Sequence, residues 1–201
     1  MNIKRIITNG LEENCYIVSD GDVGAIVDPG GCAEYILSVT RGLSVKHIFL
    51  THGHFDHILA ANELRSALGA KVYVSAKDAP LLKSEEDSLA RDFGFKHDEI
   101  FFDETVKDGD KIKVGKMMFE VIETPGHTDG CVCYRCGNAL FSGDTLFKLS
   151  IGVHSMENAE TIYASIKKLM RLPEDTHVFP GHNDDTTIGF EKKNNPYASV
   201  K

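Results

Sequence analysis

The stretch Thr51-His52-Gly53-His54-Phe55-Asp56-His57 places four side chains that can bind a metal within six residues. It follows the compact apolar run of residues 46–50, which predicts a buried strand, and precedes residues 58–68, which predict a helix. A loop at the end of a strand can turn alternate side chains toward one point, while the strand holds its base. A single motif of this kind also occurs in exposed loops, so the interpretation depends on the rest of the chain.

Three further ligand-type residues each follow a glycine at the end of a predicted strand. They stand in Pro125-Gly126-His127, Ser142-Gly143-Asp144 and Pro180-Gly181-His182. Glycine lets the backbone pass close to a crowded centre. The order of these residues allows two metal sites, the first formed by His52, His54 and His127 and the second by Asp56, His57 and His182. Asp144 could bridge the two sites. A set of imidazoles and carboxylates suits Zn, Mn or Fe better than Ca.

The spacing of strand and helix signals predicts an α+β fold. Short apolar runs separated by turn signals predict strands in both halves of the chain, and residues 157–171 predict an amphipathic helix. Residues 76–95 have a helix-like pattern that is broken by Pro80 and by an acidic run. They could form a flap over the site or a pair of surface helices. Few βαβ crossovers are evident, so we expect sheets packed on each other with helices outside.

Length and charge exclude several classes of protein. A chain of 201 residues predicts one domain over residues 1–201. The net charge of -8 argues against general binding of nucleic acid or of anionic membranes. The chain contains neither an apolar stretch of spanning length nor a secretory signal, so we expect a cytoplasmic protein.

The five cysteines fit free thiols in a reducing compartment. Cys131, Cys133 and Cys136 form a C-x-C-x-x-C pattern, whose spacing resembles zinc or redox motifs. A structural zinc site needs four ligands, and no fourth cysteine is near in sequence. We therefore interpret them as ordinary buried thiols.

The motifs THGHFDH, PGHTDG, SGDTLF and PGH, in this order, resemble those of the metallo-β-lactamase superfamily, and in particular its short, single-domain, glyoxalase II-like hydrolases. The resemblance covers nearly the whole chain, including Asn14-Cys15-Tyr16 and Asp28-Pro29-Gly30. It implies a four-layer αββα sandwich with the metal site at the edge between the two sheets. It also implies two divalent metal ions, zinc or else iron or manganese, held by the seven residues above. Asp28 would orient ligands.

Two adjacent divalent ions can share a hydroxide and polarise a carbonyl, so the expected function is a metal-dependent hydrolase. Attack by the bridging hydroxide on a small acyl thioester suits this chemistry, because a thiolate leaves readily. Asp56 would orient the hydroxide and accept its proton. The expected partner is a small-molecule substrate; the oligomeric state stays open.

Some residues depart from the glutathione-using members of the family. Only 19 residues follow His182 in this sequence, so we expect no counterpart of the C-terminal helical part that helps hold glutathione. The Lys and Tyr of those enzymes are replaced by Gly152-Val153-His154-Ser155, and Asp184 stands where they carry a Tyr. These departures weigh against recognition of glutathione. His154 is either a substrate contact or an ordinary loop histidine.

Two other functions are compatible with the motifs. A mononuclear iron persulfide dioxygenase shares the His-His-Asp ligands, although the Gly-Arg-x-Asp pattern common in that branch is absent. A phosphodiesterase or RNA-processing nuclease would need a basic surface, which the net charge of -8 opposes. Metal content and oxygen consumption separate the first alternative from a hydrolase.

Overall fold

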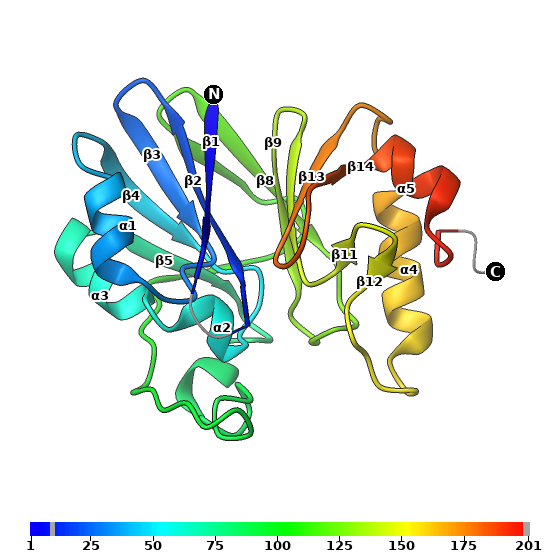
Figure 1. Cartoon of the computed structure of the whole chain (residues 1–201), viewed down its shortest axis with the longest axis horizontal. Helices are drawn as coiled ribbons and strands as arrows, with labels where there is room; N and C mark the ends of the chain where they lie inside the picture. The colour runs from blue at the N-terminus through cyan, green and yellow to red at the C-terminus, as the bar shows by residue number, and fades with distance from the viewer. Residues whose placement is uncertain (9–10, 199–201) are drawn as a thin grey trace.

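Two mixed β-sheets of six strands each face one another (Figure 1). The computed structural model describes residues 1–8 and 11–198. The first sheet contains, in spatial order, β1 (Asn2–Ile7), β2 (Asn14–Asp20), β3 (Val23–Val27), β4 (Ser44–Phe49), β5 (Lys71–Ser75) and β6 (Glu104–Val106). The second contains β14 (Thr186–Thr187), β13 (His177–Pro180), β10 (Ala139–Gly143), β9 (Val132–Cys136), β8 (Met117–Glu123) and β7 (Lys111–Val114). A small ribbon pairs β11 (Leu146–Phe147) with β12 (Ser150–Ile151).

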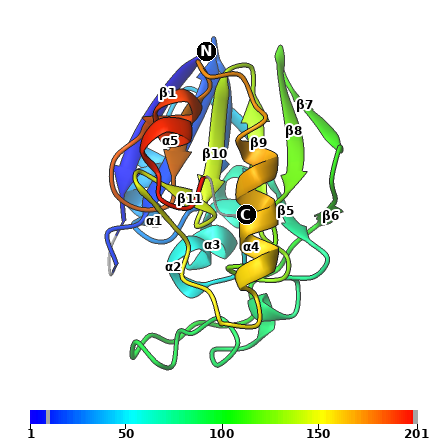
Figure 2. The same ribbon diagram turned by 90° about the vertical axis from the view of Figure 1, so that its right-hand side faces the viewer.

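Helices cover the outer faces of both sheets (Figures 1 and 2). On the first sheet they are α1 (Ala33–Val39) and α3 (Ala61–Leu68), and on the second they are α4 (Ala159–Leu169) and α5 (Ile188–Asn194). The short α2 (Phe55–Ile58) lies at one end of the sheets. The prediction of an αββα sandwich is therefore confirmed.

Apolar side chains form three buried layers, which account for the four-layer architecture. Ile26, Ile36 and Leu64 belong to the cluster between the first sheet and its helices. Phe49 and Phe141 belong to the cluster between the sheets. A third cluster, between the second sheet and α4 and α5, contains residues such as Ile166 and Val178. A single strand contributes side chains to two of these layers, because neighbouring side chains of a strand point to opposite faces of the sheet.

The strand directions bring the predicted ligand loops to one edge. β3, β4 and β5 run parallel, so the residues after β3 and β4 emerge at the same end of the first sheet. β10 and β13 are also parallel, and β8 has the same direction because it and β10 are both antiparallel to β9. The loops that follow β8, β10 and β13 therefore leave the second sheet at one end.

Two helix predictions need correction. The helix predicted over residues 58–68 begins late, at Ala61 as α3, because the Ala60 N–H donates to the carbonyl of Pro29 at 2.9 Å and the chain turns between the end of α2 at Ile58 and α3. Residues 76–95 form turns with a single short 3-10 helix, η1 (Leu81–Lys83). Leu89 and Gly94 adopt left-handed φ angles of 65° and 76°, which an α-helix cannot contain.

The cysteine-containing segment forms the predicted hairpin of β9 and β10. Cys133 packs in the layer under α4, whereas Cys136 packs between the sheets. All five cysteines are free, and Cys131, Cys133 and Cys136 are buried, so the three thiols are ordinary core groups. Within the described part of the chain, no helix is long and apolar enough to cross a membrane.

Candidate metal centre

The seven predicted ligands converge at the shared edge of the two sheets. Donor atoms lie within 4.8 Å of one another in three overlapping groups: His52, His54 and His127; His52, His57 and Asp144; and Asp56, His57 and His182. The first and third groups coincide with the two sites predicted from the sequence. Each draws two residues from the segment after β4, which runs from the loop of His52 and His54 into α2 with Asp56 and His57, and one from a loop of the second sheet. The structure thus brings all seven together; their role as ligands stays a prediction.

Asp144 lies between the two groups, as a bridging ligand must. Its Oδ1 is 3.4 Å from His57 Nε2, and its Oδ2 is 3.5 Å from His182 Nε2. The same Oδ2 is 3.7 Å from Nε2 of His127, which belongs to the other group. One carboxylate can therefore reach both sites.

Hydrogen bonds on the far side of the rings orient the imidazoles. His127 Nδ1 lies 2.7 Å from the carbonyl of Val153, and His182 Nδ1 lies 3.1 Å from the carbonyl of Leu11. Because a carbonyl only accepts, these Nδ1 atoms carry the hydrogen and leave Nε2 with a free lone pair toward the centre. Carbonyl partners of this kind hold the ligand rings of metal sites in place. On the inner side, the Nδ1 of His54 lies 2.9 Å from Nε2 of His127, so both nitrogens face the same point.

Asp28 occupies the orienting position that the sequence predicts. Its carboxylate accepts hydrogen bonds from the N–H and the hydroxyl of Thr51, at 2.7 and 2.6 Å. It is also 3.1 Å from His57 Nδ1, and the Thr51 hydroxyl is 3.1 Å from His52 Nδ1. One carboxylate thus positions His57 directly and His52 through Thr51. Asp28 adopts a positive φ of 47°, which this network holds in place.

The electrostatics differ between the two ends of the cluster. Burial, reinforced by the neighbouring imidazoles, lowers the pKa of His54 to about 4 and that of His52 well below its usual range. Burial also acts to lower the pKa of His57, but the carboxylates of Asp144 and Asp28 outweigh it and raise that pKa. The pKa of His182 is raised against burial by its hydrogen bond with Asp56. The end of the cluster formed by His57 and His182 with their carboxylates therefore favours positive charge more than the end formed by His52 and His54.

The residues fit a divalent cation. His52 Nε2, His57 Nε2 and Asp144 Oδ1 are buried and have no hydrogen-bond partner among the described residues. A buried polar atom without a partner is costly, and metal coordination removes that cost. Imidazole and carboxylate donors suit zinc, iron or manganese.

Two buried carboxylates near the cluster were missed by sequence reasoning. Asp78 accepts hydrogen bonds from Gly53 N–H at 2.9 Å, Thr128 Oγ1–H at 2.7 Å and Gly130 N–H at 2.8 Å. It therefore joins the loop of His52 and His54 to the loop of His127. Burial raises its pKa, and these hydrogen bonds oppose the rise. The only sequence signal was the pair of glycines beside the ligand motifs: a Cβ added at Gly130 would clash with the Asp78 carboxylate.

The second missed residue, Glu13, is completely buried behind His57. Its Oε1 lies 3.9 Å from His57 Nδ1, and its Oε2 accepts a hydrogen bond from the Thr8 hydroxyl at 2.7 Å. Burial raises the pKa of Glu13 well above its usual range. No motif in the sequence distinguishes this glutamate from the exposed acidic residues.

A cleft of about 470 Å³ opens over the cluster. His54, Asp56, His127, Asp144 and His182 form its floor, and His154 is part of its wall. The His154 ring packs edge-on against Tyr163, with 5.7 Å between ring centroids. The cleft places His154 where a substrate would pass, although its role stays a prediction.

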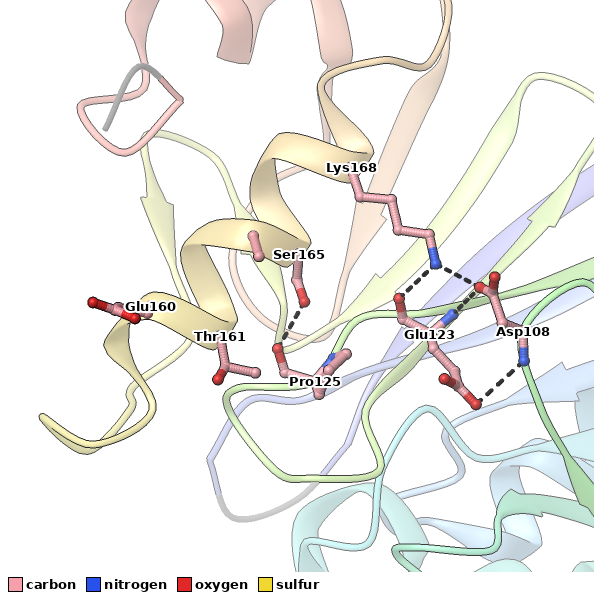
Figure 3. A pocket seen from close by; sticks show the side chains of 8 residues that line it. Asp108, Glu123, Pro125, Glu160, Thr161, Ser165 and Lys168 are labelled. Carbon is pink, nitrogen blue, oxygen red and sulfur yellow. Dashed lines mark hydrogen bonds and ion pairs between the residues drawn. The ribbon is translucent and has the colours of Figure 1, made fainter. Parts of the chain in front are cut away.

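A second hollow, of about 510 Å³, lies beside α4 and contains none of the predicted ligands (Figure 3). Ser165 donates a hydrogen bond to the carbonyl of Pro125 at 2.7 Å, and Lys168 reaches Asp108 and the carbonyl of Glu123 (Figure 3). These contacts anchor the base of the His127 loop on α4.

Comparison with known proteins identifies relatives along the whole chain. The family described as the metallo-beta-lactamase superfamily matches residues 8–182. Hydroxyacylglutathione hydrolase GloC of Haemophilus influenzae is 33% identical, with 100% of both chains covered. The crystal structure of BLEG-1 B3 metallo-beta-lactamase superposes with a TM-score of 0.92 at 33% identity, covering 99% of this chain and 100% of that one. TTHA1623 in a di-iron-bound form has a TM-score of 0.85 at 36% identity, covering 96% and 99%.

Proposed function

The chain belongs to the metallo-β-lactamase superfamily and is a metal-dependent hydrolase of that superfamily, and we propose that its substrate is a small acyl thioester. The observation that carries the proposal is the convergence of seven imidazole and carboxylate side chains, several with unpartnered atoms, five of which line an open cleft. The similarity to GloC, which is named a hydroxyacylglutathione hydrolase, supports a thioester over other acyl compounds.

We assign the first ion to His52, His54 and His127 and the second to Asp56, His57 and His182, with Asp144 shared. When bound, the two ions would polarise the acyl carbonyl and lower the pKa of a water molecule toward neutrality. Zinc fits the donors, and iron is equally compatible with them, since the similar TTHA1623 has been observed with two irons.

Asp56 is the candidate for handling the proton of the attacking water. Burial acts to raise its pKa, but the hydrogen bond with His182 and the nearby His57 together lower it. Its Oδ2 lies 3.3 Å from His182 Nε2, so the carboxylate belongs to the second predicted site, and it also lines the cleft that would hold the substrate. Water adds to the acyl carbon, the carbon–sulfur bond breaks, and the thiolate leaves. A thiol has a pKa of about 8.5, so its thiolate needs little assistance as a leaving group.

The test combines ligand variants with metal analysis. We expect His54→Ala and Asp144→Ala each to lower the bound metal, measured by mass spectrometry of the purified protein, from two ions to one or fewer. Thioester turnover should fall by at least about 100-fold, because even residues that only support ligands account for about 10–100-fold. His177→Ala removes an exposed histidine outside the cluster and is the matched control.

Full activity in a metal-free His54→Ala/Asp144→Ala double variant would contradict the mechanism. One iron per chain together with oxygen consumption would favour the persulfide dioxygenase instead.

A further inference from the structure

Exposed apolar side chains gather at the mouth of the metal cleft. Leu11, Leu89, Phe93 and Val153 line it and are 39%, 37%, 50% and 83% exposed. Large apolar side chains on a surface are common singly, but a group around a concave site indicates a binding surface. These four come from three separate segments of the chain, so local sequence composition does not explain why they meet.

The apolar wall is attached firmly to the metal loop. The Phe55 ring is buried, and its centroid lies 5.3 Å from that of Phe93 and 4.9 Å from that of Phe95. The Phe55 N–H donates to the carbonyl of Ser88 at 2.9 Å, which ties residues 84–95 to the loop. Since Phe55 stands between His54 and Asp56, the wall has a defined position beside the predicted ligands.

The rest of the lining is polar but lacks cations. His154, Ser155 and Asn158 supply polar groups to the lining, and the two carboxylates, Asp56 and Asp144, belong to the predicted metal ligands. No Lys or Arg is among the described residues that line the cleft. Multiply charged thiol carriers therefore find no ion-pair partner at the wall, whereas an apolar group finds a surface that removes it from water.

We propose that the surface formed by Leu11, Phe55, Leu89, Phe93 and Val153 binds the acyl group, and that the enzyme prefers thioesters of apolar aliphatic acids over hydroxyacyl ones. This inference rests on the proposed thioesterase function. Burial of each added methylene should raise kcat/KM by about threefold until the wall is filled. The thiol carrier lies toward the polar side and solvent.

The test varies the acyl group on one uncharged carrier. The metal-loaded protein is assayed with the acetyl, lactoyl, butanoyl and hexanoyl thioesters of N-acetylcysteamine. The same four acyl groups are then tested as thioesters of glutathione and of coenzyme A. We expect kcat/KM for hexanoyl to exceed that for lactoyl by at least about tenfold on every carrier. Phe93→Ala and Leu89→Ala should lower the hexanoyl-to-lactoyl ratio by about three- to tenfold. Met118→Ala, which removes an exposed side chain on β8 outside the cleft, is the control.

Calorimetric titration with hexanoate and with lactate gives a measurement that needs no turnover. Tighter binding of hexanoate, weakened by Phe93→Ala, supports the inference. The inference would be overturned if the lactoyl thioester were hydrolysed as fast as the hexanoyl one or faster. It would also be overturned if the hexanoyl-to-lactoyl ratio were unchanged in both variants, or if kcat/KM depended on the thiol carrier and not on the acyl group. If no thioester is hydrolysed, the proposed function fails, but the two titrations still decide whether the wall binds apolar acids.

Discussion

At the scale of single residues, the centre depends on which nitrogen of each imidazole faces inward. Backbone carbonyls hold Nδ1 of His127 and His182, and Asp28 holds Nδ1 of His57. The His-rich motif could be recognised in the sequence because its ligands are four neighbouring residues. The supporting carboxylates could not be recognised in this way. Asp78 accepts hydrogen bonds from backbone N–H groups 25 and 52 positions away, and such pairings exist only after folding.

The cysteines allow a prediction at the same scale. Burial raises the pKa of Cys133 to about 12 and those of Cys15 and Cys131 well above their usual range. Because the raised pKa keeps these buried groups in the unreactive thiol form near neutral pH, they should react slowly, and the thiolate fraction grows as pH rises. Iodoacetamide at pH 8 should therefore label one site quickly in the native protein, Cys32, which is partly exposed.

Intact mass and peptide mapping measure this labelling. In denaturant all five cysteines should react, and Cys32→Ser should remove the fast phase. Rapid native labelling of Cys133 or Cys136 would show that these thiols are accessible.

At the scale of elements, alternation predicted most strands because each strand places side chains in two layers of the core. Residues 76–95, for which the sequence left open a flap over the site or a pair of surface helices, form turns and one short 3-10 helix, and Leu89 and Phe93 of this segment line the cleft. Their structure is set by tertiary hydrogen bonds, such as Phe55 N–H to the carbonyl of Ser88 and Ile100 N–H to the carbonyl of Leu82 at 2.8 Å. The local amino-acid composition does not indicate which distant groups will form these hydrogen bonds. The convergence of the ligand loops, in contrast, followed from their common position after strands.

Asp78 allows a prediction about this segment. Asp78→Ala leaves the N–H groups of Gly53 and Gly130 without their acceptor and should lower the free energy of unfolding by about 3 kcal/mol. The apparent metal affinity should fall about tenfold, since the substitution loosens two ligand loops. Denaturant unfolding of the metal-free protein and competition with a chelator measure the two effects. The exposed Asp92→Ala is the control from the same segment, and equal behaviour of both variants would contradict the role.

At the scale of the whole molecule, stability and chemistry occupy different places. The interior is held by aromatic packing between the sheets, where the Phe49 ring lies 4.9 Å from Phe119 and 4.8 Å from Tyr134. The predicted ligands lie at the edge, on loops. The αββα architecture was predictable because motif order and strand-rich halves pointed to the same fold. The three-layer distribution of apolar side chains needed the structure.

Phe49→Ala should therefore destabilise the protein without removing a ligand. A fully buried phenylalanine replaced by alanine costs about 3–5 kcal/mol, because a cavity remains. The denaturant midpoint should fall accordingly, while the metal content of the folded protein at low temperature stays at the wild-type value. Loss of metal in fully folded Phe49→Ala protein would show that the two regions are coupled.

The division of the ligands between the sheets has a consequence for the order of events during folding. Each predicted site takes two residues from the segment between β4 and the end of α2 and one from beyond residue 126. A growing chain that has completed only its first sheet therefore carries four of the seven predicted ligands, two for each site. We therefore expect tight metal binding only after the second sheet has docked, so that the centre is completed only in a chain that has finished folding.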